Sequence, residues 1–141
     1  MRKLRLALGS NDGKEIIDSH MGEANYFYIY EIDEAGNYSL IDKRVNNTLQ
    51  EKHHGDENKL KGTSAIFNDC SVVVARHKSP NFIRMSEKTR FQPVVIRKAQ
   101  ISDALEAFKE IFNTVYEYVE RRNKGERFKE IVQVGHENKN K

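Results

Sequence analysis

The sequence predicts an α/β fold in three layers, with a mixed five-stranded sheet between helices on both faces. Three observations support this prediction. The first third of the chain reads as strands joined by short turns, the middle holds two short apolar runs separated by helical patterns, and the end holds a long amphipathic helix. The resulting order, β-β-β-α-β-α-β-α, predicts a hairpin sheet that is extended by helix-connected parallel strands.

The first three strands form an antiparallel unit in this prediction. Residues 3–8 (KLRLAL) alternate basic and apolar side chains, which is typical of a half-buried strand. Residues 9–20 are rich in Gly, Ser, Asn and Asp, the residues of turns and loops. The aromatic run 26–32 and the run 38–45 flank the short turn 33–37 (DEAGN), so we expect them to pair as a hairpin.

The middle of the chain predicts the parallel strands. A polar loop at 46–59 precedes the segment 59–70 (KLKGTSAIFNDC), which suits a short helix. The run 71–75 (SVVVA) has no alternation, which favours a strand covered on both faces and therefore inside the sheet. The run 93–96 (PVVI) predicts the next strand after a further short helix.

A helix over about 102–122 completes the expected fold. Ser102 is the expected N-cap, and Gly125 stands just beyond the end. Apolar residues follow the 3,4 spacing of one buried face: Ile101, Leu105, Phe108, Phe112, Val115 and Val119. We therefore expect a single domain over residues 1–123 and a polar C-terminal extension over residues 124–141.

Composition narrows the class of protein. The chain has 141 residues, of which 38% are hydrophobic and 32% are charged, and no run approaches the ~18 apolar residues of a membrane span. The basic start is not followed by a signal-peptide core, and the single cysteine excludes an internal disulfide, so we expect a cytoplasmic protein. The net charge of +3 permits an anionic partner without identifying one, and the strongly basic surface typical of nucleic-acid-binding modules is not evident in the sequence.

The candidate site lies in the loops after the first and fourth predicted strands, which should meet at the carboxyl edge of the sheet. His20 is a candidate metal contact, and the nearby Gly22 is expected to give the loop its conformational freedom. Arg76, His77 and Lys78 form a basic segment that suits an anion. The alternative for His20 is an ordinary surface or capping histidine, and the alternative for residues 76–78 is a solvated charged loop.

Cys70 is a second candidate metal ligand, because thiolates bind soft metals. The alternative is a small buried hydrophobe, since free cysteine is among the residues most often found inside proteins.

No motif in the sequence indicates catalysis. The chain has no GxSxG, P-loop, HExxH or paired cysteines, so we do not expect an enzyme. Two alternatives to a cofactor-binding role remain open at this stage. One is a protein-interaction or regulatory module that uses the helix 101–123, and the other is a weak nucleic-acid-binding domain without cofactor.

Residues 6–33 resemble the start of the dinitrogenase iron–molybdenum cofactor biosynthesis family, which includes NifX-type and NafY-type proteins. Its members have a strand, a polar loop, a His-Phe-Gly motif and an aromatic strand; here His20, Met21 and Gly22 occupy the motif. The likeness continues through 67–75 (FNDCSVVVA) and on to about residue 115. The family often has glycine in the loop after the fourth strand, where this chain has Arg-His-Lys-Ser.

The resemblance implies a ribonuclease-H-like topology and a non-catalytic protein that binds or carries an iron–sulfur or iron–molybdenum cofactor. The family histidine, His20 here, is implicated in that binding. The implied partners are the metal cluster itself and a cluster-assembly or acceptor protein. Such a role is compatible with one thiol and a few imidazoles, which can hold a preassembled cluster weakly, while Arg76 and Lys78 balance its negative charge.

Overall fold

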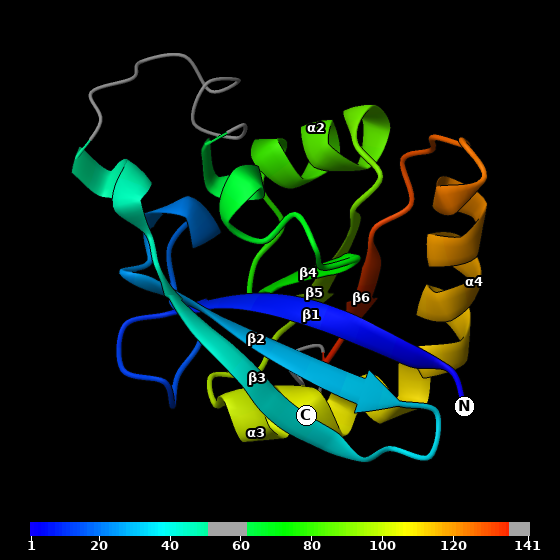
Figure 1. The fold of residues 1–141 in the computed structure, drawn as a ribbon, viewed down its shortest axis with the longest axis horizontal. Coiled ribbons are helices and arrows are strands. Elements are labelled where there is room, and N and C mark those ends of the chain that lie inside the picture. The colour runs from blue at the N-terminus through cyan, green and yellow to red at the C-terminus, as the bar shows by residue number, and fades with distance from the viewer. Residues whose placement is uncertain (51–61, 136–141) are drawn as a thin grey trace, which may run out of the picture.

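The computed structural model describes residues 1–50 and 62–135, which form an α/β fold around a six-stranded mixed sheet (Figure 1). The strands are β1 (Lys3–Ser10), β2 (Tyr26–Asp33), β3 (Tyr38–Val45), β4 (Val72–Ala75), β5 (Gln92–Ile96) and β6 (Val132–Val134). The helices are α2 (Pro80–Lys88), α3 (Ile101–Phe108) and α4 (Phe112–Asn123), with single 3₁₀ turns at Met21–Glu23, Asn47–Gln50 and Lys109–Ile111. A further helical stretch occupies residues 62–66. Residues 51–61, which fall in the predicted loop 46–59 and the start of the predicted helix 59–70, lie outside the described residues.

The strand order is β3-β2-β1-β4-β5-β6. β1 pairs antiparallel with β2, and β2 with β3, whereas β4, β5 and β6 continue the sheet in the direction of β1. The first five strands thus have the predicted ribonuclease-H-like arrangement. The run 71–75 is confirmed as an interior strand, because β4 lies between β1 and β5 and all four of its residues are buried.

The sixth strand is a difference from the expected five. β6 comes from the segment 124–141, and it pairs with β5 through Val94↔Val132 and Ile96↔Val134. Val132 and Val134 are two residues apart on a strand, so both face the same side of the sheet. That side is packed against the core, and the burial of these two apolar side chains favours their addition to the sheet.

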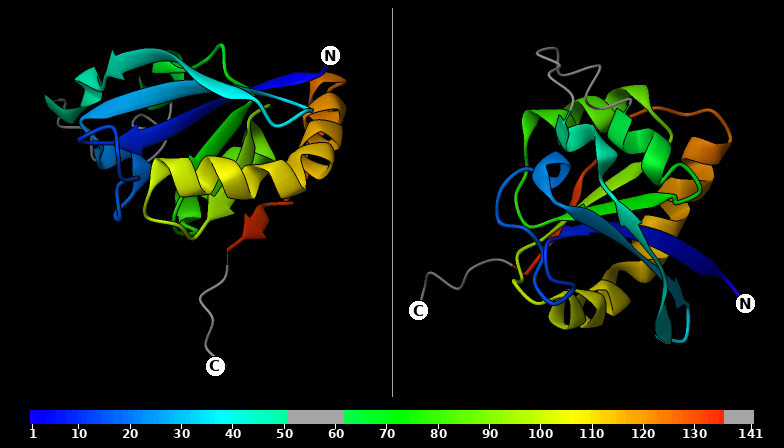
Figure 2. Two further views of the ribbon diagram at one scale, coloured as in Figure 1. Left: turned by 90° about the horizontal axis from the view of Figure 1, so that it is seen from below. Right: turned by 60° about the vertical axis from the view of Figure 1, so that its left-hand side comes forward.

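Helices cover both faces of the sheet, as predicted. Figures 1 and 2 show α3 and α4 on one side and α2 with the stretch 62–66 on the other. On the first side, Leu6, Val74 and Ile96 of the sheet pack with Leu105 and Phe108 of α3 and Val115 of α4. On the second side, Ala7, Phe27, Val73 and Val95 pack with Phe67 and with Phe82 and Met85 of α2. No helix among the described residues is long and apolar enough to cross a membrane.

The long helix predicted over 102–122 is wrong in one respect, because the structure divides it. α3 ends at Phe108, a 3₁₀ turn follows, and α4 starts at Phe112 after Ile111, whose φ of −111° and ψ of 6° lie outside the helical region. Both helices bury their apolar faces in one cluster, so the bend keeps the chain against the twisted sheet. The N-cap is Gln100 rather than Ser102, and the amide of Ile101 donates to the carbonyl of Lys14 at 2.8 Å.

Candidate functional site

A pocket with a volume of about 290 Å³ opens beyond the carboxyl ends of β1 and β4. Its polar residues come from the loop before the first 3₁₀ turn, from the loop after β4, from the start of α2 and from the stretch 62–66: Asp18, Ser19, His20, His77, Lys78, Ser79, Asn81 and Thr63. Its apolar residues come from the second core: Met21, Phe27, Phe67, Ala75, Phe82 and Met85. The predicted meeting of the loops 9–22 and 75–81 at this edge is therefore confirmed.

The loop that carries His20 is fixed by its own hydrogen bonds. The Ser10 hydroxyl donates to the carbonyl of Glu15 at 2.5 Å, and the Asp12 carboxylate accepts from the amides of Lys14 and Glu15, both at 2.9 Å. His20 then precedes the turn Met21–Glu23 and its carbonyl accepts from the amide of Glu23 at 2.9 Å. The imidazole itself is exposed and makes no capping hydrogen bond, so it is free to meet a ligand.

Gly9, not Gly22, is the glycine that this turn requires. A β-carbon on Gly9 would lie 2.9 Å from the Ala24 β-carbon and 3.2 Å from the Met21 carbonyl oxygen, so the turn packs directly on the backbone of β1. Gly22 is not among the glycines with positive φ, so the conformational freedom expected for it is not used. Gly22 lines the pocket, and its carbonyl accepts a hydrogen bond from the Asn46 amide at 2.9 Å.

Asn46 is a structural residue that the sequence analysis missed. Its buried side chain donates to the carbonyls of Gly22 and Ala24, at 2.9 and 2.8 Å, and its own oxygen accepts from the Thr48 hydroxyl at 2.6 Å. The residue thereby attaches the turn after His20 to the end of β3. In the sequence, Asn46 begins a polar stretch and looks like any loop residue, so no local signal identified it.

The basic segment after β4 divides into residues with different surroundings. Arg76 is half-buried, 3.4 Å from the carbonyl oxygen of Ile16 and 3.6 Å from the Asp18 carboxylate, and it does not line the pocket. His77 lines the pocket and lies 2.6 Å from Asp18. Lys78 lines it with an exposed side chain for which no partner is found among the described residues. Ser79 then caps α2, accepting from the amide of Phe82, with Pro80 at the first helical position.

Asp18 connects the two loops electrostatically. The hydrogen bond from His77 and the nearby charge of Arg76 hold the pKa of the Asp18 carboxyl below its ordinary value, so this exposed group is a carboxylate at neutral pH. In the sequence, Asp18 is one of the turn-forming residues of the loop 9–20, and no partner for it is evident. Its partner comes from a segment about sixty residues away, which only the fold brings close.

Cys70 does not belong to this pocket. It precedes β4 and so lies at the amino end of that strand, opposite to the carboxyl end where His20 and His77 gather. The side chain is fully buried in the second core, and burial, with a smaller contribution from the charge of Asp69, raises the pKa of the thiol to about 12. The structure therefore supports the alternative of a small buried hydrophobe, and we do not retain Cys70 as a ligand.

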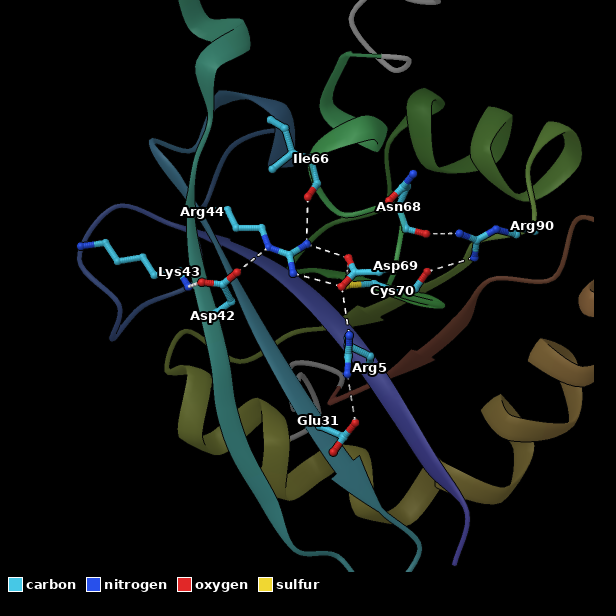
Figure 3. A network of polar contacts seen from close by, with 10 residues as sticks. All are labelled: Arg5, Glu31, Asp42, Lys43, Arg44, Ile66, Asn68, Asp69, Cys70 and Arg90. Atoms are coloured by element: carbon cyan, nitrogen blue, oxygen red, sulfur yellow. Dashed lines mark hydrogen bonds and ion pairs between the residues drawn. The ribbon is translucent and has the colours of Figure 1, made fainter.

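A network of charged side chains surrounds Asp69, next to Cys70 (Figure 3). Asp69 accepts hydrogen bonds from Arg44 of β3 and from Arg5 of β1, and Arg44 also donates to the carbonyl of Ile66 at 2.9 Å. These contacts tie the segment 62–70 to the sheet. Because Thr63 and Phe67 of this segment line the pocket, the network helps to fix the part of the pocket wall that they form.

The residues present offer few metal ligands. No group of three or more His, Cys, Asp or Glu side chains that could hold a metal ion occurs within residues 1–50 and 62–135. The pocket instead presents two imidazoles, one free ammonium and a wall of aromatic and thioether side chains. Such a set fits a preassembled metal cluster held by a few contacts better than a bare ion, which needs a closed coordination shell.

Comparison with known protein families matches residues 2–111 to the family described as dinitrogenase iron-molybdenum cofactor. The match includes both pocket loops and all strands except β6. No curated protein matches the chain.

Proposed function

The chain belongs to the dinitrogenase iron-molybdenum cofactor family, and from this membership we propose that it is a non-catalytic carrier of a preassembled metal cofactor. The family indicates a part in the biosynthesis or binding of that cofactor. The cargo we propose is a cluster of the iron–sulfur or iron–molybdenum type. One observation carries the proposal: the two pocket loops bring His20, His77 and Lys78 to the rim of one partly apolar pocket.

His20 is the principal contact in this proposal. Neutral imidazole is a good ligand for iron and similar metals, and the His20 ring is exposed and free of a capping bond. The aromatic side chains of Phe27, Phe67 and Phe82 provide an apolar surface against which the weakly hydrated sulfides of a cluster can lie. Binding through so few ligands suits a protein that must release its cargo.

The charge of the pocket rim suits an anionic cargo. Lys78 is exposed at the rim, and Arg76 is on the same loop but does not line the pocket. The Arg76 guanidinium is already close to Asp18, so Lys78 is the cation that remains to balance a negative cluster. The metal cluster and a cluster-assembly or acceptor protein are the partners that follow from this role.

A second candidate function is protein interaction through the edge strand β3. Leu40, Ile41 and Val45 are exposed on this strand, at 49%, 43% and 65%, and an unpaired strand edge is a template for another chain. The helix surface first considered for this role is less suitable, because α3 and α4 turn their apolar faces into the core, where Ile111 and Tyr116 also pack. An acceptor protein docked on β3 would be compatible with a carrier function.

Anaerobic binding measurements test the carrier proposal. The purified chain is titrated with isolated iron–molybdenum cofactor and, separately, with a synthetic thiolate-ligated [4Fe–4S] cluster, and metal that co-elutes with the protein is quantified together with the optical spectrum. We expect His20→Ala to weaken retention about tenfold or more, or ~1.4 kcal/mol, without changing Tm. Glu23→Ala, an exposed residue of the same turn that does not line the pocket, is the control. Failure of the wild-type chain to retain either cluster would contradict the proposal.

A further inference from the structure

His77 and Asp18 form a histidine–carboxylate pair at the rim of the pocket. The Nε2 atom of His77 lies 2.6 Å from Oδ1 of Asp18, and the Arg76 guanidinium lies 3.6 Å from the same oxygen. The two side chains are 58% and 71% exposed. An ion pair with this exposure contributes little to folding stability, which leaves orientation of the imidazole as its main effect.

The pair determines which ring nitrogen is available. An exposed aspartate is ionised at neutral pH, and a carboxylate can only accept hydrogen bonds, so the 2.6 Å contact between Nε2 of His77 and Oδ1 of Asp18 has the ring as its donor. In the neutral ring, Nε2 must therefore carry the proton that it donates to Asp18. Nδ1 then has a free lone pair, and no hydrogen-bond partner for this atom is found among the described residues. A metal-bound histidine characteristically donates its other ring N–H to a carboxylate, which fixes its tautomer.

We propose that His77, oriented by Asp18, is a second imidazole ligand of the cargo and binds through Nδ1, while His20 binds from the other loop. This inference rests on the proposed carrier function. It assigns Asp18 as a positioning residue, which acts on the cargo only through the His77 ring. The cargo would then be bound from both loops. The His20 imidazole lies before the turn Met21–Glu23, and the His77 imidazole follows β4.

The other charged groups around the pair agree with this assignment. Arg76 approaches the carboxylate and not the ring, so it supports Asp18 without competing for Nδ1. Lys78 follows His77 in the sequence and also lies at the pocket rim. Its ammonium group is only a donor, so it cannot accept a hydrogen bond from Nε2. Asp18 is thus the only carboxylate found in contact with His77 within the described residues.

The first test needs no cargo. Long-range ¹H–¹⁵N correlation spectra of the apo chain at pH 8, above the ordinary titration range of histidine, report which nitrogen of each ring is protonated. We expect His77 to be protonated at Nε2 in the wild type and to become a mixture of tautomers in Asp18→Asn. A wild-type ring protonated at Nδ1 would overturn the inference and leave the carrier function standing.

The second test compares anaerobic binding of isolated iron–molybdenum cofactor to wild type, His77→Ala, Asp18→Asn and Glu23→Gln. We expect His77→Ala and Asp18→Asn to weaken binding about tenfold each, because loss of an orienting carboxylate typically lowers metal affinity 10–100-fold. Glu23→Gln removes the same charge from an exposed side chain off the pocket and should bind as the wild type does. Thermal unfolding confirms that each variant is folded.

The outcomes separate the two proposals. Binding that is weakened by His20→Ala but unchanged in both His77→Ala and Asp18→Asn would overturn this inference and retain the carrier function. Weaker binding by His77→Ala with full binding by Asp18→Asn would remove the positioning role of Asp18. A wild-type chain that binds no cargo would overturn the carrier function and this inference with it.

Discussion

The guanidinium of Arg44 on the edge strand β3 forms a two-point contact with the carboxylate of Asp69 before β4. Nη1 lies 2.6 Å from Oδ1 and Nη2 lies 3.0 Å from Oδ2. Between these residues lie β2 and β1, so the pair spans the width of the hairpin sheet, and Arg5 of β1 joins it at 3.0 Å (Figure 3). The segment 62–70, which forms part of the pocket wall, is therefore attached to the sheet by the ion pairs of Asp69 as well as by apolar packing.

Asp69→Asn should destabilise the fold by about 1–2 kcal/mol at pH 7. Charge-assisted hydrogen bonds contribute roughly 1.5–3 kcal/mol, and the carboxylate is 38% exposed, so solvent screening reduces that figure. The substitution leaves Arg44 and Arg5 facing a neutral amide. Denaturant unfolding measures the loss, and Glu117→Gln, an exposed acidic residue on α4, gives the effect of removing one negative charge elsewhere.

The pH dependence of this loss has a definite sign. Hydrogen bonds from Arg44, and then from Arg5, hold the pKa of the Asp69 carboxyl far below its ordinary value. As the pH falls below about 4, the unfolded chain binds a proton at this residue before the folded chain does, so stability declines. The difference between wild type and Asp69→Asn should be constant above about pH 5 and shrink below about pH 4. A constant difference down to pH 2 would show that the carboxylate charge is not responsible.

Gly9→Ala should disturb the turn after His20. The added β-carbon would meet the Ala24 β-carbon at 2.9 Å, closer than such atoms approach, so the turn Met21–Glu23 must move away from β1. We expect a stability loss of about 1–3 kcal/mol, typical of overpacking, and weaker cargo binding because His20 moves with the turn.

Gly22→Ala is the matched control for Gly9→Ala. Gly22 does not have a positive φ, so alanine meets no backbone strain there and should change stability by less than about 1 kcal/mol. Equal losses of folding stability in Gly9→Ala and Gly22→Ala would contradict the assignment of Gly9 as the glycine that the turn requires.

The first five strands and the helices on both faces of the sheet could be predicted from the sequence because their signals are local, whereas β6 and the division of the long helix could not. The unalternating run ending at Ala75 identified the interior strand, and the hairpin turn DEAGN identified the antiparallel half of the sheet. The position of the pocket followed from topology alone, since loops after neighbouring parallel strands meet at one edge of the sheet. The bend at Ile111 was not predictable, because a 3,4-spaced apolar pattern is the same in one helix and in two that share a core.

The contacts between residues of the pocket loops could not be predicted from the sequence. Asp18 and His77 are separated by 59 positions, and Asn46, just after β3, contacts the turn at Gly22 from 24 positions away. The local sequence around each of these residues gives no sign of the residue that it contacts. The sequence drew attention to Gly22 because it is close to His20. The glycine that packs against the turn Met21–Glu23 is Gly9, and this contact between separate segments depends on the tertiary structure.

Lys78→Gln should weaken binding of an anionic cluster several-fold and make binding less sensitive to salt. Lys78 is exposed at the pocket rim, and the attraction between an exposed cation and an anion is reduced by screening ions. Binding titrations at two salt concentrations measure both effects. Lys124→Gln removes the same charge at the end of α4 and should leave affinity unchanged. An affinity loss of equal size in both variants would attribute the effect to net charge and not to the rim.

Cys70 should be inert in the folded chain and dispensable for cargo binding. Its sulfur is fully buried, and burial raises the pKa of the thiol to about 12, so the reactive thiolate is nearly absent at pH 8. Alkylation by iodoacetamide should therefore be at least about 100-fold slower in the native chain than in the unfolded chain. Cys70→Ala should lower the free energy of unfolding by about 1–2 kcal/mol through lost packing, and cargo affinity should match the wild type, in contrast to His20→Ala. Rapid native alkylation, or a binding loss as large as that of His20→Ala in a folded Cys70→Ala protein, would return the thiol to the set of ligands.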